Sequence, residues 1–179
     1  MSTSQTLKTY RPVFVFIGKF AGIYILLTGL YRYYLSLYPH QTDPLTRTVG
    51  KSVDFLFKIT GINASTPPLE QEHGLKLIIN NEYVARIVEG CTAMSVIIMF
   101  VAFILAFSPS IKKSLTFAIA GSLLIFVFNI IRIAVLGYML YAYPEYQDFS
   151  HRIIFPALIY GFVVLLWIYY LQKNEKGKS

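Results

Sequence analysis

The sequence has little charge and almost no cysteine. Charged residues make up 14% of its 179 residues, against about a quarter in soluble domains. Since the apolar fraction reaches 55%, a water-soluble globule would lack enough polar surface to cover itself. The single cysteine, Cys91, excludes an intramolecular disulfide, a CxxC redox pair and a multi-cysteine zinc site. The composition therefore indicates an integral membrane protein, and any chemistry at Cys91 proceeds without a second thiol from this chain.

The net charge of +7 is not arranged for nucleic-acid binding. The lysines and arginines do not form one basic stripe with interleaved aromatic residues, which is the pattern of a nucleic-acid-binding surface. Most of them stand at the ends of apolar runs, where they indicate the orientation of membrane spans. We expect a lipid bilayer as the environment and no nucleic-acid partner.

Four apolar runs are candidate membrane spans, each of which needs about 20 residues. They cover residues 13–38, 91–107, 115–141 and 152–171. The first run ends in tyrosines and Pro39 instead of a small-residue cleavage site, which favours a retained span over a signal peptide. The sequence therefore predicts an all-α integral-membrane fold with four transmembrane helices in a bundle, as a single domain over residues 1–179.

Positive charges orient these spans. The short segments 1–12, 108–114 and 172–179 carry seven lysines or arginines, and the segment 142–150 carries none. Because cytoplasmic loops hold the excess of Lys and Arg, we expect both termini in the cytoplasm. Residues 39–90 and 142–150 would then lie outside, and the basic residues in the long outer segment weigh less in this rule.

Residues 39–90 form an external insertion, because none of its segments is long and apolar enough to cross a membrane. Apolar residues at helical spacing predict an amphipathic helix that either lies on the membrane interface or packs as a cap over the bundle. These residues are Val49, Val53, Leu56 and Phe57. Residues 64–74 contain two consecutive prolines and are expected to form a turn-rich break. Within it, His73 is expected to be solvated and not a metal ligand.

A short β-hairpin is predicted at the end of the insertion. Leu75, Leu77 and Ile79 alternate with Lys76, Ile78 and Asn80. A second β-rich run covers residues 83–88, and the Asn-Asn pair between the two runs tolerates the positive φ of a tight turn. The second run continues directly to Cys91, so the hairpin would hold the thiol at the mouth of the bundle. We expect Gly90 to permit a sharp change of chain direction there.

Helical rise places three reactive side chains at one depth. At 1.5 Å per residue, about 26, 28 and 32 Å of helix separate Cys91, Arg132 and His151 from the inner ends of their spans. All three would then lie near the outer surface on one face. An arginine within an apolar stretch costs several kcal/mol unless it faces a polar cavity or a partner. Asn129, three residues earlier on the same helical face, can hold the Arg132 guanidinium in place.

A thiol, a guanidinium and an imidazole at one membrane boundary indicate acyl transfer. A nearby cation and an imidazole both favour the thiolate, which is the form that attacks. The imidazole of His151 can take the thiol proton and pass it to a leaving amine, and Arg132 can stabilise the oxyanion. Cys91 alone could be a small buried residue, and His151 alone an interfacial histidine. Their shared depth favours a reaction through a thioester.

These residues resemble those of a known family. The ordered set is Glu89-Gly90-Cys91, Asn129-x-x-Arg132 and His151. It is similar to that of the exosortase/archaeosortase family of integral-membrane cysteine transpeptidases, over roughly residues 75–170. The short length and the Glu-Gly-Cys-Thr sequence are closest to the exosortase F type of Bacteroidetes.

The resemblance implies Cys91 as nucleophile, Arg132 as stabiliser of the oxyanion or thiolate, and His151 as general acid and base. Glu89, Gly90 and Asn129 would support them, and no cofactor or metal is expected. The implied substrate is an exported protein with a C-terminal sorting signal, namely a short motif, an apolar span and a basic tail. The enzyme would cut near the motif and transfer the new carboxyl end to a lipid or glycan acceptor at the cell surface. It would lie in the bacterial inner membrane, with its active site on the periplasmic face.

Two other functions fit the same residues. In a non-enzymatic membrane assembly factor, Arg132 and Asn129 would bind a partner helix while Cys91 only packs, so that Cys91→Ala would be silent. In a membrane peptidase, water would hydrolyse the thioester without transfer, and the mass of the product would distinguish it from a transpeptidase.

Overall fold

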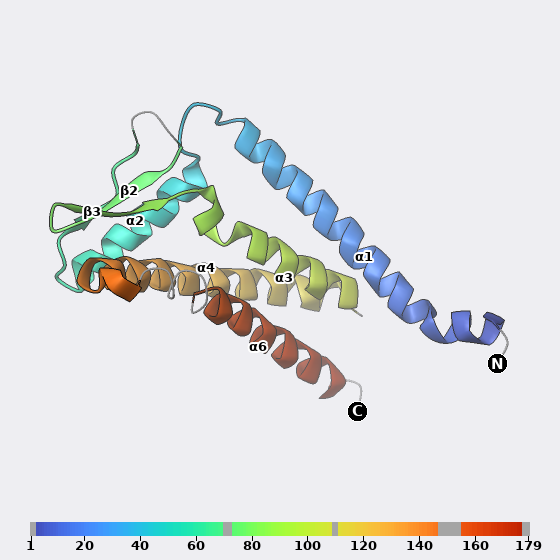
Figure 1. Ribbon diagram of the computed structural model, residues 1–179. Coiled ribbons are helices and arrows are strands. Elements are labelled where there is room, and N and C mark those ends of the chain that lie inside the picture. Colours follow the sequence, from blue (N-terminus) through green and yellow to red (C-terminus); the bar gives the residue numbers. More distant parts are fainter. Residues whose placement is uncertain (1–2, 70–72, 109–110, 147–154, 177–179) are drawn as a thin grey trace.

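In the part of the chain that the structure describes, four helices pack side by side and a small lobe covers one end of them (Figure 1). The structure, a computed structural model, describes residues 3–69, 73–108, 111–146 and 155–176. The four helices are α1 (Thr3–Ser36), α3 (Met94–Phe107), α4 (Ile111–Ala142) and α6 (Phe155–Lys176). The lobe consists of α2 (Pro44–Ile59) and a sheet, whereas the beginning of α1 and the end of α6 lie at the opposite end. The predicted fold class is confirmed.

Three of the described helices are long and apolar enough to cross a membrane. The stretches are Tyr10–Ser36, Lys112–Ala142 and Pro156–Lys173. The predicted span 91–107 corresponds to α3, which has 14 residues. At about 1.5 Å per residue it measures roughly 21 Å, less than the hydrocarbon core of about 30 Å. The predicted count of four spans is therefore not confirmed, because a turn takes the first three residues of the second run.

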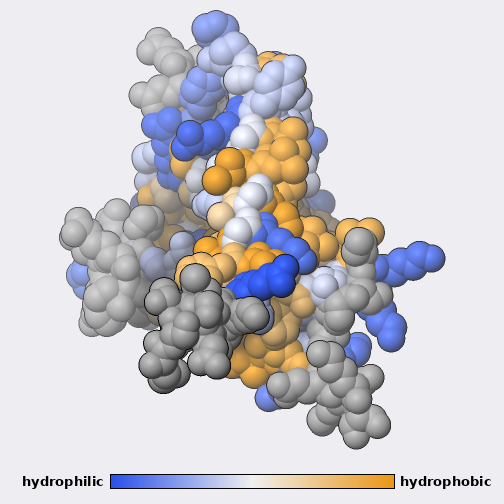
Figure 2. Space-filling model, turned by 90° about the vertical axis from the view of Figure 1, so that its right-hand side faces the viewer, coloured by the Kyte–Doolittle hydropathy of each residue, from blue (hydrophilic) through white to orange (hydrophobic). Residues whose placement is uncertain are grey.

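Large apolar side chains stand on the outside of the long helices. In α1, Phe14 is 62% exposed and Ile25 is 69% exposed. Figure 2 shows hydrophobic residues over much of the middle of one face, with hydrophilic residues gathered toward its upper end. Because soluble monomers rarely expose large contiguous apolar patches, this surface fits contact with lipid.

α3 lies at the centre of the bundle and contacts α1, α4 and α6. Phe100 is fully buried, and Phe103 stacks on Trp167 with ring centroids 4.3 Å apart. A Cβ at Gly121 of α4 would lie 2.4 Å from the Phe100 ring, so only glycine permits this approach of the two helices. This close packing fixes the position of α3 and of the turn that precedes it.

α2 packs as a cap over one end of α4. Its amphipathic pattern is confirmed, since Val49 and Val53 are fully buried and Phe55 is 65% exposed. The buried face shares one core with residues of the sheet and of α4. Asp43 caps the helix by accepting hydrogen bonds from two backbone N–H groups of its first turn, which stabilises a helix by about 1 kcal/mol. Of the two arrangements expected for this helix, the structure shows the cap.

The sheet has three antiparallel strands in the order β1 (Ala64–Ser65), β2 (Leu75–Ile79), β3 (Glu82–Ile87). β2 and β3 form the predicted hairpin. Asn80 and Asn81 at its turn have φ values of 49° and 68°, the left-handed conformation that a two-residue hairpin turn requires. β1 lies in the stretch 64–74, for which the sequence predicts only turns, because two residues are too few to show an alternating pattern.

Candidate active site

Cys91 lies in a tight turn between the sheet and α3. Glu89–Thr92 form this turn, η1, a 3₁₀ helix that follows β3 almost directly. The Cys91 N–H donates to the carbonyl oxygen of Val88 over 2.8 Å, and the Thr92 hydroxyl donates to the carbonyl oxygen of Glu89 over 2.8 Å. The thiol-bearing residue is partly exposed and packs against the core of the lobe. The hairpin therefore leads into the cysteine at the lobe end of the bundle.

The chain changes direction at Ala93 and not at Gly90. Ala93 has a φ of 57°, and α3 begins at the next residue. Gly90 lies within the 3₁₀ turn without a positive φ, and a Cβ there would meet no atom within 4 Å. Gly90 lies in the turn, as predicted, but does not adopt the left-handed conformation that glycine favours. An alanine does so instead, against a steric cost of about 1–2 kcal/mol for the left-handed conformation.

Asn129 connects the turn to Arg132. Its side chain is fully buried. Its Nδ2 donates to the carbonyl oxygen of Cys91 over 2.7 Å, and its Oδ1 accepts from Nη1 of Arg132 over 3.1 Å. Because a buried amide needs partners for both its donor and its acceptor, these two bonds fix the cysteine backbone relative to the guanidinium. The predicted contact between Asn129 and Arg132 is present, and the bond to Cys91 had no signal in the sequence.

Arg132 is half-buried on α4 beside the turn. Its guanidinium interacts electrostatically with Cys91 and with Tyr160 of α6. The structure thus brings two of the three predicted reactive residues together. His151 lies outside the described residues, so its place beside them stays a prediction.

Two tyrosines near the site are not among the residues predicted from sequence. The Tyr31 hydroxyl of α1 lies 3.4 Å from the Thr92 hydroxyl, and Tyr160 approaches Arg132 from α6. In a sequence, tyrosines toward the ends of spans indicate an aromatic belt. That pattern does not distinguish these two from the other tyrosines of the chain.

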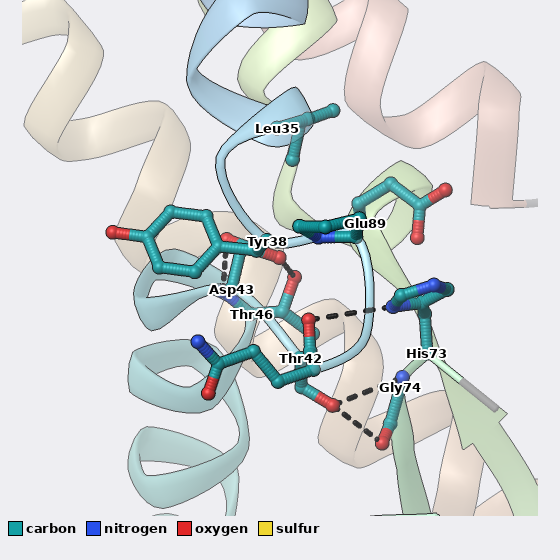
Figure 3. A pocket seen from close by; sticks show the side chains of 10 residues that line it. Leu35, Tyr38, Thr42, Asp43, Thr46, His73, Gly74 and Glu89 are labelled. Atoms are coloured by element: carbon teal, nitrogen blue, oxygen red, sulfur yellow. Dashed lines mark hydrogen bonds between the residues drawn. The ribbon is translucent and has the colours of Figure 1, made fainter. Parts of the chain in front are cut away.

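A pocket of about 150 Å³ opens beside the turn (Figure 3). It is lined by the segment between α1 and α2, by the beginning of α2, by His73 and Gly74 before β2, and by Glu89. Glu89 is exposed. His73, expected to be solvated, is also exposed, with its Nδ1 3.3 Å from the carbonyl oxygen of Gln41. Among the described residues no group of three or more His, Cys, Asp or Glu could hold a metal ion.

Asp54 is an acidic group of the lobe outside this pocket. Burial raises the pKa of its carboxyl, and hydrogen bonds from Thr66 partly oppose this rise. The Thr66 hydroxyl donates to Oδ2 of Asp54 over 2.8 Å. The pair ties α2 to the segment that follows β1.

The chain matches the family model described as transmembrane exosortase over residues 14–171. The match contains the turn, Asn129 and Arg132. No curated protein and no solved structure matches the chain.

Proposed function

The chain belongs to the transmembrane exosortase family, and from this premise we propose that it is a membrane-embedded cysteine transpeptidase. Its substrate is an exported protein with a C-terminal sorting signal, which is cut through a thioester on Cys91 and transferred to a lipid or glycan acceptor. One observation carries the proposal. The buried amide of Asn129 bonds both to Arg132 and to the backbone of the only cysteine, which supports a role for Arg132 in stabilising an oxyanion that forms at Cys91.

The reaction takes two steps. The Cys91 thiolate attacks the carbonyl carbon of the scissile peptide bond, and the guanidinium of Arg132, which stays charged, stabilises the developing oxyanion. As the C–N bond breaks, His151 gives a proton to the leaving amine. The acceptor then attacks the thioester, His151 takes the acceptor's proton, and the C–S bond breaks to restore the thiolate.

Asn129 acts in this scheme as a positioning residue. Its bonds of 2.7 and 3.1 Å leave little freedom between the turn and Arg132. A displacement of about 1 Å at a reacting centre can cost roughly 100-fold in rate. We therefore expect Asn129 to keep the Arg132 guanidinium in a fixed position relative to Cys91 during the reaction.

We place the protein in the bacterial inner membrane with both termini in the cytoplasm and the lobe in the periplasm. The beginning of α1, the end of α3, the beginning of α4 and the end of α6 share one end of the molecule (Figure 1). Lys112, Lys113 and Lys173 belong to these inner segments, as the excess of positive charge in cytoplasmic loops requires. The candidate site, at the lobe end, then faces exported substrates.

The test is processing by a Cys91→Ala variant in cells. The readout is the fraction of exported proteins that retain their C-terminal span, with the abundance of the variant checked in the same membranes. We expect no processing, whereas a Ser95→Ala control, at an exposed position in the first turn of α3, should process normally. The product mass separates transfer from hydrolysis, because transfer adds the mass of the acceptor. Normal processing by Cys91→Ala would contradict an enzymatic role.

A further inference from the structure

The pocket beside the turn is held open by its own hydrogen bonds (Figure 3). The Thr42 hydroxyl donates to the carbonyl oxygen of Gly74 over 2.9 Å and lies 3.1 Å from the Gly74 N–H, which donates back. Thr42 and Asp43 are each 5% exposed, so they form a buried part of the lining. These bonds tie the segment between α1 and α2 to the start of β2. The pocket is therefore formed before any ligand arrives.

The lining offers acceptors. The ten described residues that line it include two carboxylates, those of Asp43 and Glu89, and no lysine or arginine. The Asp43 carboxylate is occupied by the first turn of α2. The Glu89 carboxylate forms no hydrogen bond or ion pair with any other residue that the structure describes. Of the two carboxylates, that of Glu89 is therefore the one left to accept hydrogen bonds from a ligand.

Two cations at the edge limit how negative the pocket is. Arg47 donates to Oε1 of Gln41 over 3.3 Å, and Arg86 donates to the carbonyl oxygen of His73 over 2.7 Å. Both bonds engage residues that line the pocket, although neither arginine lines it. A neutral amide and a cation can therefore both bind Glu89, whereas a carboxylate would meet an acceptor without a proton to share.

The pocket is within reach of a peptide held at Cys91. Glu89 precedes Cys91 by two residues in a 3₁₀ turn, which corresponds to a rise of about 4 Å. Successive residues of an extended peptide are about 3.3 Å apart. A side chain within three residues of the scissile bond could therefore enter the pocket. A cavity of about 150 Å³ accommodates one group the size of benzene, so it holds one side chain.

We propose that this pocket is the recognition subsite for a side chain of the exported protein that donates hydrogen bonds: Asn, Gln, Lys or Arg, within three residues of the scissile bond. Glu89 is the residue that determines this specificity. The inference rests on the proposed function, because it presumes a peptide bound at Cys91.

A charge exchange tests the subsite. Each residue within three positions of the cleavage point of a processed substrate is replaced by Glu in turn, and processing is measured with wild-type enzyme and with Glu89→Lys. At one position Glu should lower processing by wild-type enzyme at least about 10-fold, the scale expected for a lost hydrogen bond to a charged group. Glu89→Lys should process that same substrate better than the original. Glu82→Lys, at an exposed position at the start of β3, is the matched control and should show no exchange.

Photo-cross-linking keeps the test decisive if Glu89→Lys fails to accumulate. A photoreactive residue is placed at Gln41, which lines the pocket and is exposed, or at Glu82 as control, in a Cys91→Ala background that retains substrate. Cross-links to the substrate from position 41 and not from position 82 would support the subsite. Equal cross-linking from both positions would contradict the subsite. So would the absence of any substrate position at which Glu89→Lys restores the processing of a Glu-substituted substrate. Processing that depends on Cys91 would leave the proposed function standing in either case.

Discussion

Substitutions of Asn129 should show clearly how far its two hydrogen bonds stabilise the fold and how far they support substrate processing. Asn129→Leu keeps a side chain of similar size but removes both the donor to the Cys91 carbonyl oxygen and the acceptor for Arg132. Asn129→Asp keeps an acceptor for Arg132 and adds an ion pair, yet an ionised carboxylate cannot donate to Cys91. The two variants therefore test the two bonds separately.

The expected magnitudes differ for stability and activity. Losing two buried hydrogen bonds, one of them to a charged group, costs about 2–4 kcal/mol, so Asn129→Leu should inactivate at a lower temperature. Asn129→Asp should be the more stable of the two. Both variants should lose processing by roughly 100-fold, the scale of a displacement of about 1 Å between reacting groups.

Purified protein in detergent, assayed for thermal inactivation, and cells, assayed for substrate processing, give the two readouts. Ser114→Ala is the control, because the Ser114 hydroxyl is buried and lies 2.7 Å from the Tyr170 hydroxyl of α6. Ser114 lies about 22 Å from Asn129 along α4, toward the beginning of that helix. It should lose stability without losing activity per folded molecule. Wild-type processing by Asn129→Leu at normal abundance would show that Asn129 does not position Cys91 and Arg132 for the reaction.

Three further predictions concern the turn, the lobe and the topology. Gly90→Ala should fold normally, because a Cβ there meets nothing within 4 Å. Ala93→Gly should raise the free energy of unfolding by up to about 1 kcal/mol. Thermal inactivation measures both, and a large loss of stability in Gly90→Ala would show that the turn is misplaced. Because burial raises the pKa of Asp54, its contribution to stability is fully present below the unfolded-state pKa and is lost as the pH rises through the folded-state value. When the free energy of unfolding is measured from about pH 3 to pH 7, its decline with pH should be smaller in Asp54→Asn than in the wild type. An equal decline in the variant would show that another group causes it. Reporter fusions at residues 60, 111 and 146 should report outside, inside and outside, and an outside signal at 111 would invert the proposed orientation.

Local patterns predicted much of the lobe. The Asn80-Asn81 pair indicated the hairpin turn because few other residues adopt a positive φ without cost. The spacing of Val49 and Val53 indicated the buried face of α2 because a helix repeats every 3.6 residues. In both cases neighbouring residues determine the structure.

The turn before α3 was less predictable. The left-handed residue is Ala93, and alanine carries no preference for that conformation, whereas the glycine three residues earlier does. The packing of α3 between α1, α4 and α6 decides where the chain bends. No pattern within the turn itself expresses that constraint.

For the candidate site, the sequence indicated that Cys91 and Arg132 lie near each other along the helices, but not which hydrogen bonds connect them. Helical rise placed Cys91 and Arg132 at one level, and the spacing of three residues put Asn129 beside Arg132. The bond from Asn129 to Cys91, 38 residues apart, depends on how α4 rotates against the turn. The rise per residue gives the position of a side chain along a helix and not the direction in which it points. For the same reason Tyr31 and Tyr160 were not predicted.

Capture of the acyl-enzyme is the direct test for a thioester on Cys91. Purified enzyme is mixed, in the absence of an acceptor, with a substrate peptide that spans the cleavage point. The reaction is then quenched in acid and examined by intact-protein and peptide mass spectrometry. We expect an adduct on Cys91 whose mass equals that of the amino-terminal part of the peptide less one water. Neutral hydroxylamine should release this adduct, as expected for a thioester. A Cys91→Ser enzyme should give no hydroxylamine-labile adduct. Cleavage of the peptide by wild-type enzyme with no adduct at Cys91, or with an equal rate in Cys91→Ala, would contradict the account.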